Sequence, residues 1–422
     1  MKVIIIGAGP AGLITALRLK LANNAQPVIY ELRAKPSNIG GAIQLPPNGV
    51  RLLDRLGLLP RIQARAFSGS HLMLHSTRSE VLVDLDRAAA TRKDVNFEYM
   101  RILRGDLMDV LMEAVHEQKI TIHFSKQLKS IEETGSDVGV TFADGHHDRG
   151  ELLLGCDGIH SAVRSLHIDP SVHPEYTGIS NMFGLLPTSA LEAANFPIEP
   201  ALHATMTTNG MLGLSPYSRE GNHLYWFFSQ SVPLPGDHSR EGWQATGERE
   251  VNRFKDQLLG SLEGATGAWI QTLKDVVQKT DSIKFYPVFK LPAESKWFSD
   301  HCLLMGDAAH AMPPHLGQGT SMALEDAFLL SRLLEDNSRP LSDVFSLYQT
   351  VRRPRTSEIG KASVGRATGR HTVSPFMQRI RELGIGIGFQ LYKAANLQYF
   401  GVGTDRDVIM YDIMEVPLSL VP

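Results

Sequence analysis

The sequence has few of the features that mark secreted, membrane-spanning or nucleic-acid-binding proteins. It has two cysteines among 422 residues, Cys156 and Cys302, too few for a disulfide framework and without metal-ligand spacing. Both lie in apolar runs, so we expect small core residues. No run approaches about 18 uninterrupted apolar residues, and the net charge is −3. We therefore predict no membrane span, no nucleic-acid surface and a reducing, cytoplasmic setting.

Signatures of catalysis by protein side chains alone are also scarce. The 16 histidines show no metal-ligand clustering, so no metal site is expected. We interpret His310 as structural, and the adjacent carboxylates Glu325 and Asp326 as supporting or surface residues of a helix. The glycines of segment 384–388 follow no strand and have the wrong spacing for a nucleotide fingerprint. The catalytic residues are therefore unknown, and we expect only one dinucleotide fold.

A glycine-rich turn begins seven residues into the chain. The apolar run 3–6 precedes it and a helical stretch at 13–21 follows it, which is typical of a dinucleotide-binding unit. Gly7 allows the tight turn, Gly9 lets the backbone approach a pyrophosphate, and Gly12 lets the helix pack close to the strand. The helix N-terminus then offers free N–H groups to the phosphates.

The second apolar run of this unit, 27–30, ends at Glu31. Its carboxylate would accept hydrogen bonds from a ribose diol and repel a 2′-phosphate, which favours FAD or NAD over NADP at this turn. Lys2 followed by apolar residues also resembles the start of a signal peptide. The three glycines and Pro10 that interrupt the apolar run argue against that interpretation.

The strand-like and helical runs predict a discontinuous nucleotide-binding domain with a second domain inserted. We assign to the nucleotide-binding domain 1–70, 101–170 and 299–340, to a sheet-rich substrate domain 71–100 and 171–298, and to a helical C-terminal region 341–422. Strands are expected near 120–124, 138–142, 152–155, 201–207, 223–229 and 283–290. Helices are expected at 106–117, at 321–334 and beyond Leu341, with breaks at Pro354 and Pro375. The polar segment 233–250 indicates a surface loop.

Two further motifs complete a resemblance to a known family. Residues 155–164 read GCDGIHSAVR, and residues 303–319 read LLMGDAAHAMPPHLGQG. With the N-terminal turn, and in this order, they resemble the group A FAD-dependent monooxygenases, typified by p-hydroxybenzoate and salicylate hydroxylases. Tyr348 and the run 352–355 are similar to the helix that follows in that family. The resemblance implies an α/β fold: a Rossmann-like FAD-binding domain, an inserted, mostly antiparallel β-sheet substrate domain and a helical C-terminal region.

The motif at 303–319 is expected to hold the flavin end of FAD. A short acid after a strand can reach a ribityl hydroxyl, which suggests Asp307, and consecutive prolines stiffen the loop. Glycine N–H groups could lie against the planar ring, beside the positive end of the next helix. Ser321 stands where many relatives have Asn, and we expect it to cap that helix. The expected contacts are Asp307, Pro314, Gly317, Gly319, Thr320 and Ser321.

Other cofactor contacts are implied by the resemblance. Arg104 matches an arginine that approaches the FAD pyrophosphate, although a solvated surface arginine is the alternative. The segment Gly41–Ala42 passes along the cofactor, and Arg33 could hold the adenosine end. Asp157, with Ser161 and Arg164, lies near the flavin and is linked to nicotinamide binding. On residue chemistry alone, Asp157 could equally cap a surface turn.

The inserted sheet supplies the candidate substrate contacts. Strand alternation would point only half of them into a pocket, and a core position is the alternative for each. They are Met206, Met211, Tyr217, Tyr225, Trp226 and Phe228.

The resemblance implies a single-component monooxygenase that takes electrons from NADPH or NADH and uses O2. A flavin C4a-hydroperoxide would hydroxylate or epoxidise an aromatic, indolic or olefinic small molecule, with a role in secondary metabolism plausible. A halogenase or reductase on the same scaffold is one alternative, although no Trp-x-Trp-x-Ile-Pro segment is present. A non-enzymatic flavin-binding protein is another, although the motifs are intact. The substrate and oligomeric state are not determined by these observations.

Overall fold

The computed structural model describes residues 1–36, 40–89, 95–191, 198–233, 251–366, 370–397 and 406–418. Within these ranges, no helix is long and apolar enough to cross a membrane. The polar loop expected at 233–250 lies almost entirely outside the described residues.

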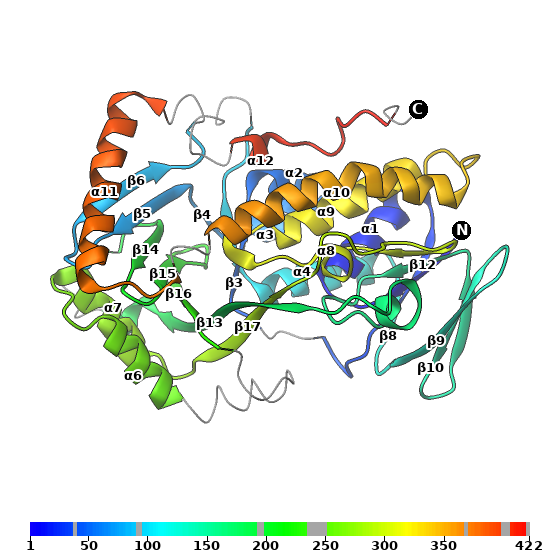
Figure 1. The fold of residues 1–422 in the computed structure, drawn as a ribbon. Coiled ribbons are helices and arrows are strands. Elements are labelled where there is room, and N and C mark those ends of the chain that lie inside the picture. Colours follow the sequence, from blue (N-terminus) through cyan, green and yellow to red (C-terminus); the bar gives the residue numbers. More distant parts are fainter. Residues whose placement is uncertain are drawn as a thin grey trace.

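A five-stranded parallel sheet forms the centre of the nucleotide-binding part (Figure 1). Its order is β18 (Cys302–Leu304), β12 (Leu152–Gly155), β1 (Lys2–Ile6), β2 (Gln26–Tyr30) and β8 (Thr121–His123). The central strands are continuous apolar runs because helices cover the sheet. Helix α1 (Pro10–Asn23) lies beside α4 (Arg104–Glu117) and α9 (Gly319–Leu333).

The parallel register brings the three sequence motifs to one edge. Ile6 pairs with Gly155, and Gly155 pairs with Leu304, so β1, β12 and β18 end side by side. Each motif continues from the carboxyl end of its strand. In open parallel sheets this edge is where ligands bind.

A seven-stranded sheet forms the inserted domain. Its order is β17 (Lys284–Lys290), β13 (Glu175–Pro187), β16 (His223–Ser231), β15 (Met211–Pro216), β14 (Leu202–Met206), β5 (His71–His75) and β6 (Val81–Asp86). Neighbouring strands are antiparallel except for β14 and β5. Helices α6 (Val251–Ser261) and α7 (Ala268–Lys279) supply residues to an apolar core on one face.

Two three-stranded sheets complete the described β-structure. One has the order β3 (Ala42–Leu45), β7 (Met100–Leu103), β4 (Phe67–Ser68), and its residues Ala42 and Leu103 contact the seven-stranded sheet. The other, β11 (His147–Gly150), β10 (Val138–Phe142) and β9 (Leu128–Glu133), projects at one end of the molecule (Figure 1). The α/β fold class predicted from the sequence is confirmed.

The remaining helices are mostly short. Up to the end of the third motif these are α2 (Pro47–Arg55), α3 (Leu59–Gln63), η1 (Arg164–Ile168), η2 (Thr188–Leu191), α8 (Asp307–His310) and η3 (Pro314–Leu316). After them come α10 (Leu341–Gly365), α11 (Pro375–Ala394) and α12 (Arg406–Met410). The strands and helices expected from the sequence are present. Most of their ends differ by one or two residues, and α1 begins three residues earlier than expected.

The predicted helix break at Pro354 is wrong. Helix α10 is 25 residues long and continues through Pro354 without a break. A proline inside a helix costs about 3 kcal/mol because it removes a backbone hydrogen bond. Phe345, Tyr348 and Ile359 of α10 are fully buried, and this packing outweighs the cost. The break before Pro375 is present, because that residue begins α11 and Ser374 caps it.

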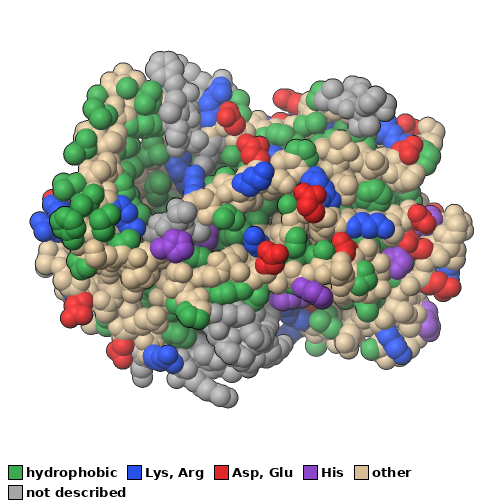
Figure 2. Space-filling model, in the orientation of Figure 1, with side chains coloured by type: hydrophobic (Ala, Val, Ile, Leu, Met, Phe, Trp, Pro, Cys, Tyr) green, Lys and Arg blue, Asp and Glu red, His purple; other side chains and the backbone are tan. Residues whose placement is uncertain are grey.

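One face of α11 is apolar and exposed. Figure 2 shows hydrophobic side chains along this helix. The exposed apolar residues of α11 are Phe376, Met377, Ile380, Leu383, Ile387 and Leu391. On the rest of this view, positive and negative side chains are dispersed.

Candidate functional site

The first turn needs its glycines for packing within the chain. Gly7 has φ +105°, and a Cβ on it would lie 2.5 Å from the carbonyl oxygen of Cys156. A Cβ on Gly12 would lie 2.0 Å from the carbonyl oxygen of Gly7. A side chain at Gly7 would therefore collide with the backbone that follows β12, and one at Gly12 would push α1 away from the end of β1.

Gly9 differs from these two glycines. No atom of the described residues lies within 4 Å of the position of its Cβ, so the space beside it is open. Gly9 precedes α1, and the N-terminus of this helix has no side-chain cap. Its unpaired N–H groups and partial positive charge therefore face a gap of the kind that a pyrophosphate fills.

Glu31 lies beside the same turn. Its Oε2 accepts a hydrogen bond from the Ala8 N–H at 2.8 Å, and its Oε1 accepts one from the Arg33 N–H at 3.0 Å. The carboxylate is thereby fixed at the end of β2, where a ribose would lie if a dinucleotide occupied the turn. The Arg33 side chain is exposed, with its Nη1 3.6 Å from Glu31 Oε1.

Asp307 follows the third strand and faces an opening. Its side chain is exposed, yet the surrounding protein raises the pKa of the carboxyl by desolvation, against the lowering effect of His310 and Arg104. Arg104 also borders Gly40, whose Cβ would lie 2.6 Å from the Arg104 Cδ. Residues 40, 104 and 307, which are far apart in the sequence, thus lie together near the carboxyl end of β18, and we call the space beside them the crevice. This arrangement suits a polar ligand with both hydroxyl and phosphate groups.

The loop before α9 forms another wall of this crevice. A Cβ on Gly317 would lie 2.9 Å from the Cβ of Gln44, so this loop lies against β3. Pro314 and Gly319 are exposed, Thr320 is half-buried, and a Cβ on Gly319 would meet no described atom within 4 Å. The loop therefore presents backbone and small residues to the opening.

The expected role of Ser321 as a helix cap is wrong. Helix α9 begins at Gly319, so Ser321 lies inside its first turn. The side chain is fully buried against Gly49 of α2, and its hydroxyl has no hydrogen-bond partner among the described residues. The helix begins two residues earlier than the sequence predicts, and no side chain caps it.

Glu325 and Asp326 of α9 support the turn that follows β18, and both side chains are buried, not at the surface. Asp326 Oδ2 accepts hydrogen bonds from the Gly306 N–H at 2.8 Å and from His310 Nε2 at 2.7 Å. Arg352 pairs with both carboxylates, at 2.6 Å to Glu325 and 2.7 Å to Asp326. Burial opposes ionisation of Asp326, but the charges of His310 and Arg352 outweigh it and hold the pKa of this carboxyl below its ordinary range.

The second motif supports the third. Asp157 Oδ2 accepts hydrogen bonds from the N–H groups of Ala162 at 2.6 Å and Val163 at 3.2 Å, so Asp157 caps its own turn. Its Oδ1 is buried without a partner among the described residues. Arg164 donates to the carbonyl oxygen of Ala308 at 2.8 Å and so joins the second turn to α8.

An aromatic face of the seven-stranded sheet borders the crevice. Phe183, Tyr217 and Tyr225 form a cluster, and Tyr286 packs against it. A Cβ on Gly41 would lie 2.3 Å from the Tyr225 Cε2, so the segment at Gly41 and Ala42 runs along this face. The side of the sheet that carries Tyr225 is therefore an aromatic face.

Strand alternation divides the candidate substrate residues. Residues 225, 227 and 229 of β16 point to one side of the sheet. Met206 pairs with Met211, and Met211 pairs with Ser229, so Met206 points to this same side. Trp226 and Phe228 lie on the other side, fully buried beneath α7. Phe228 therefore belongs to the core, whereas Met206, Tyr217 and Tyr225 remain candidate pocket residues.

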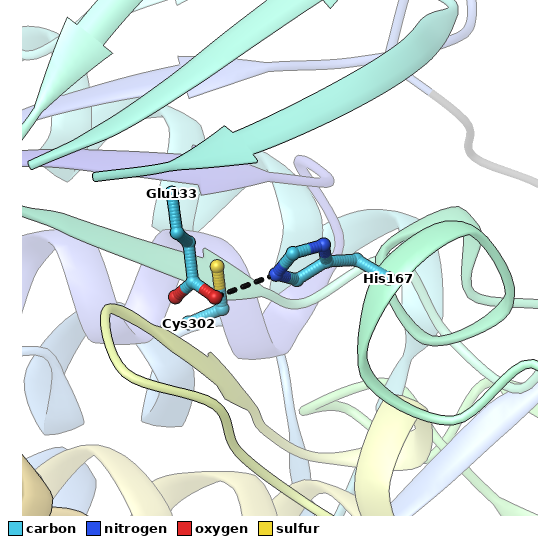
Figure 3. Close-up of side chains that lie close together, drawn as sticks. All are labelled: Glu133, His167 and Cys302. Carbon is cyan, nitrogen blue, oxygen red and sulfur yellow. Dashed lines mark hydrogen bonds and ion pairs between the residues drawn. The ribbon is translucent and has the colours of Figure 1, made fainter.

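Glu133, His167 and Cys302 form a polar cluster (Figure 3). The sequence did not predict it, because its members are far apart along the chain. His167 Nε2 lies 2.6 Å from Glu133 Oε2. Burial and the nearby Glu133 charge raise the pKa of the Cys302 thiol, and a protonated thiol is a poor metal ligand. We interpret the cluster as a hydrogen-bonded contact that ties η1 to β9.

Comparison with known proteins identifies the family. The profile of the family described as FAD binding domain matches residues 1–362, which include all three sequence motifs. The chain belongs to the FAD-binding monooxygenase family. The crevice fits this assignment, because the gap beside Gly9 and the exposed Asp307 lie where FAD needs space and a polar partner.

Monooxygenases of known activity align with most of the chain. The 6-hydroxynicotinate 3-monooxygenase of Pseudomonas fluorescens is 25% identical over 86% of this chain and 90% of its own length. The 3-hydroxybenzoate 6-hydroxylase of Klebsiella oxytoca is 28% identical over 85% of this chain and 86% of its own length. The crystal structure of Klebsiella pneumoniae HpxO with FAD and uric acid has a TM-score of 0.79 at 21% identity, covering 99% of this chain and 98% of HpxO.

Replacing Asp307 with Ala in this monooxygenase should weaken FAD binding about 10- to 100-fold. A hydrogen bond to a charged group contributes about 1.5–3 kcal/mol, and the Asp307 side chain is exposed. Flavin fluorescence titration of the apoprotein measures the dissociation constant, with the exposed Asp300→Ala as the matched control. An unchanged FAD affinity in Asp307→Ala would show that this end of the site is misplaced.

Proposed function

We propose that this flavin-dependent monooxygenase hydroxylates a hydroxylated aromatic acid, with NADPH or NADH as reductant and O2 as co-substrate. The two curated relatives named above act on 6-hydroxynicotinate and 3-hydroxybenzoate, which are both aromatic acids carrying a hydroxyl group. The supporting observation within this chain is the aromatic face against Gly41, next to the crevice of the third turn. A planar substrate would lie between the two.

The side chains of this face bind and orient the substrate in the proposed function. FAD, when bound, supplies the activation of O2 for transfer of one oxygen atom. Phe183, Tyr225 and Tyr286 provide flat apolar surfaces that exclude water. Burial raises the pKa of the Tyr225 phenol, so this residue remains protonated at neutral pH and can donate a hydrogen bond to a substrate oxygen.

Substrate-stimulated oxygen consumption tests this function. The FAD-loaded protein would be mixed with NADPH or NADH and a panel of hydroxybenzoates and hydroxynicotinates, under ¹⁸O2. The expected result is faster NAD(P)H oxidation with at least one acid, and a product that carries one ¹⁸O atom. The Gly9→Val variant, for which we expect a folded protein without FAD, is the control for background chemistry.

Some results would contradict the proposal. NAD(P)H oxidation that no aromatic compound accelerates would favour a reductase, and products without ¹⁸O would exclude oxygen transfer. Oxygen transfer to an olefin alone would replace hydroxylation by epoxidation. A cytoplasmic location remains part of the proposal, since the reductant NAD(P)H is cytoplasmic.

A further inference from the structure

Arg370 is a buried cation between α10 and α11. The residue is 4% exposed. Its Nε donates a hydrogen bond to Ser229 Oγ at 2.8 Å, and its Nη1 donates to the carbonyl oxygen of Arg366. Both of these partners are neutral. Among the residues that the structure describes, no carboxylate lies within ion-pair distance of this guanidinium.

A comparison with Arg352 shows why this is unusual. Arg352 is equally buried, but it pairs with the carboxylates of Glu325 and Asp326. Burial and the charge of Arg366 lower the pKa of Arg370 to about 10, so it stays a cation at neutral pH. A buried charge without a counter-charge is costly, and such groups in proteins are usually paired or bind an anion.

Arg370 lies at the edge of the aromatic face. Its partner Ser229 shares a side of β16 with Tyr225, and Ser229 is in register with Asn181 of β13. Asn181 Nδ2 donates to the Tyr286 hydroxyl at 3.1 Å, whereas its Oδ1 is buried without a partner among the described residues. This corner of the face therefore has one cation and one free hydrogen-bond acceptor.

The same corner touches the loop of the third motif. Ser363, near the end of α10, donates to the carbonyl oxygen of Pro313 at 2.5 Å. His315 follows in that loop, and its Nε2 is buried without a partner among the described residues. Burial and the charge of Arg370 lower the pKa of His315 to about 3, so this imidazole is neutral. It adds a hydrogen-bonding group to the corner but no competing charge.

We propose that Arg370 binds the carboxylate of an aromatic acid substrate, and that Asn181 Oδ1 accepts a hydrogen bond from a hydroxyl or amino group of the same molecule. This inference rests on the proposed function and assigns its substrate specificity to a residue outside the sheet. An anion satisfies the buried guanidinium, and a donor satisfies the free amide oxygen. A ring that carries a carboxylate and a hydroxyl or amino group would satisfy both the guanidinium and the amide oxygen.

Arg101 is the competing anchor. It is also buried, and with Arg87 it donates to Gln44 Oε1, at 3.1 and 3.4 Å. These two arginines line a small cavity with Tyr99 and Ser215. We favour Arg370 because its partner Ser229 is in register with Asn181 and its charge acts on His315, both of which have an unpartnered buried atom among the described residues. Arg101, in contrast, already donates to an amide oxygen. Arg101→Gln therefore enters the experiment as the rival variant.

The test uses the FAD-loaded protein and matched pairs of probes. Salicylate and 3-hydroxybenzoate would be compared with salicylamide and 3-hydroxybenzamide, which keep the ring and hydroxyl group but lose the negative charge. Binding is measured from the change in flavin absorbance. The wild-type protein should bind an acid at least about 10-fold more tightly than its amide. Arg370→Gln should weaken acid binding about 10- to 100-fold and leave amide binding within about threefold.

Controls separate the possible outcomes. Arg366→Gln removes a neighbouring exposed charge and should leave acid binding unchanged, and Arg370→Lys should restore part of it. Equal acid binding by Arg370→Gln and wild type, or loss of the preference in Arg101→Gln alone, would overturn the anchor and leave the proposed function standing. A wild-type protein that oxidises neutral phenols but prefers no acid would overturn the anchor even if Arg370→Gln failed to fold. No response to any aromatic compound would overturn the proposed function itself.

Discussion

Gly9→Val should yield a folded protein that does not retain FAD. The Cβ of the new side chain would meet no described atom within 4 Å, so the protein itself has room for it. The backbone at Gly9 is extended, with φ −77° and ψ −179°, which valine adopts without strain. The added methyl groups would fill the space that a pyrophosphate needs at the start of α1. We expect FAD affinity to fall by more than about 100-fold, equivalent to about 2.8 kcal/mol.

The measurement compares flavin content and stability. Absorbance of the purified variant gives bound FAD, and circular dichroism with thermal unfolding of the apoproteins shows whether the fold is kept. Gly135→Val is the matched control, because Gly135 also has open space around it but lies far along the chain, between β9 and β10. Retention of yellow coenzyme by Gly9→Val would mean that the pyrophosphate does not pass this turn.

Gly12→Val should behave differently from Gly9→Val. Its Cβ would lie 2.0 Å from the carbonyl oxygen of Gly7, so the clash is within the protein. The apoprotein itself should then lose stability. This contrast separates a glycine kept for a ligand from a glycine kept for packing.

Arg352→Met should strongly destabilise the protein. The substitution leaves Asp326 without a guanidinium partner and Glu325 with Arg355 as its remaining arginine, at 3.3 Å. Both carboxylates are at most 1% exposed, so neither can be solvated in compensation. Removing one partner of a buried ion pair costs about 3–5 kcal/mol. We expect a loss of this size in the free energy of unfolding, measured by urea denaturation of the apoprotein.

The position of Asp326 predicts a second effect of the same substitution. Asp326 also accepts the Gly306 N–H, which holds the turn before Asp307. FAD retention should therefore fall together with stability. Arg61→Met is the control, because it breaks the exposed Arg61–Glu117 pair and should change little. If Arg352→Met were as stable as that control, the buried network would not support the turn.

Local sequence patterns predicted much of the site. The glycine spacing at Gly7, Gly9 and Gly12, the acid after β2 and the strand-then-acid pattern at Asp307 each depend on neighbouring residues. Parallel pairing of β1, β12 and β18 then brings the three turns to one edge. These features could be found because each is a short-range requirement of backbone geometry.

Other features depended on neighbours that are distant in the sequence. Pro354 remains inside α10 because α10 packs on α9, and Ser321 is buried because α2 covers it. Phe228 and Tyr225 belong to the same strand, but the side on which each lies follows from strand register and the placement of α7. The sequence pattern carried no signal for these outcomes.

By itself, the sequence predicted the glycine-containing turns, because these follow from backbone conformations that only certain residues permit. The resemblance of its three motifs to a known family indicated the family and the cofactor. The tertiary structure alone decided which charges are paired. It gave Arg352 two carboxylates and left Arg370 with neutral partners at the aromatic face. The physical reason is that desolvation and ion pairing depend on what the whole fold brings within a few ångströms, and spacing along the chain does not encode it.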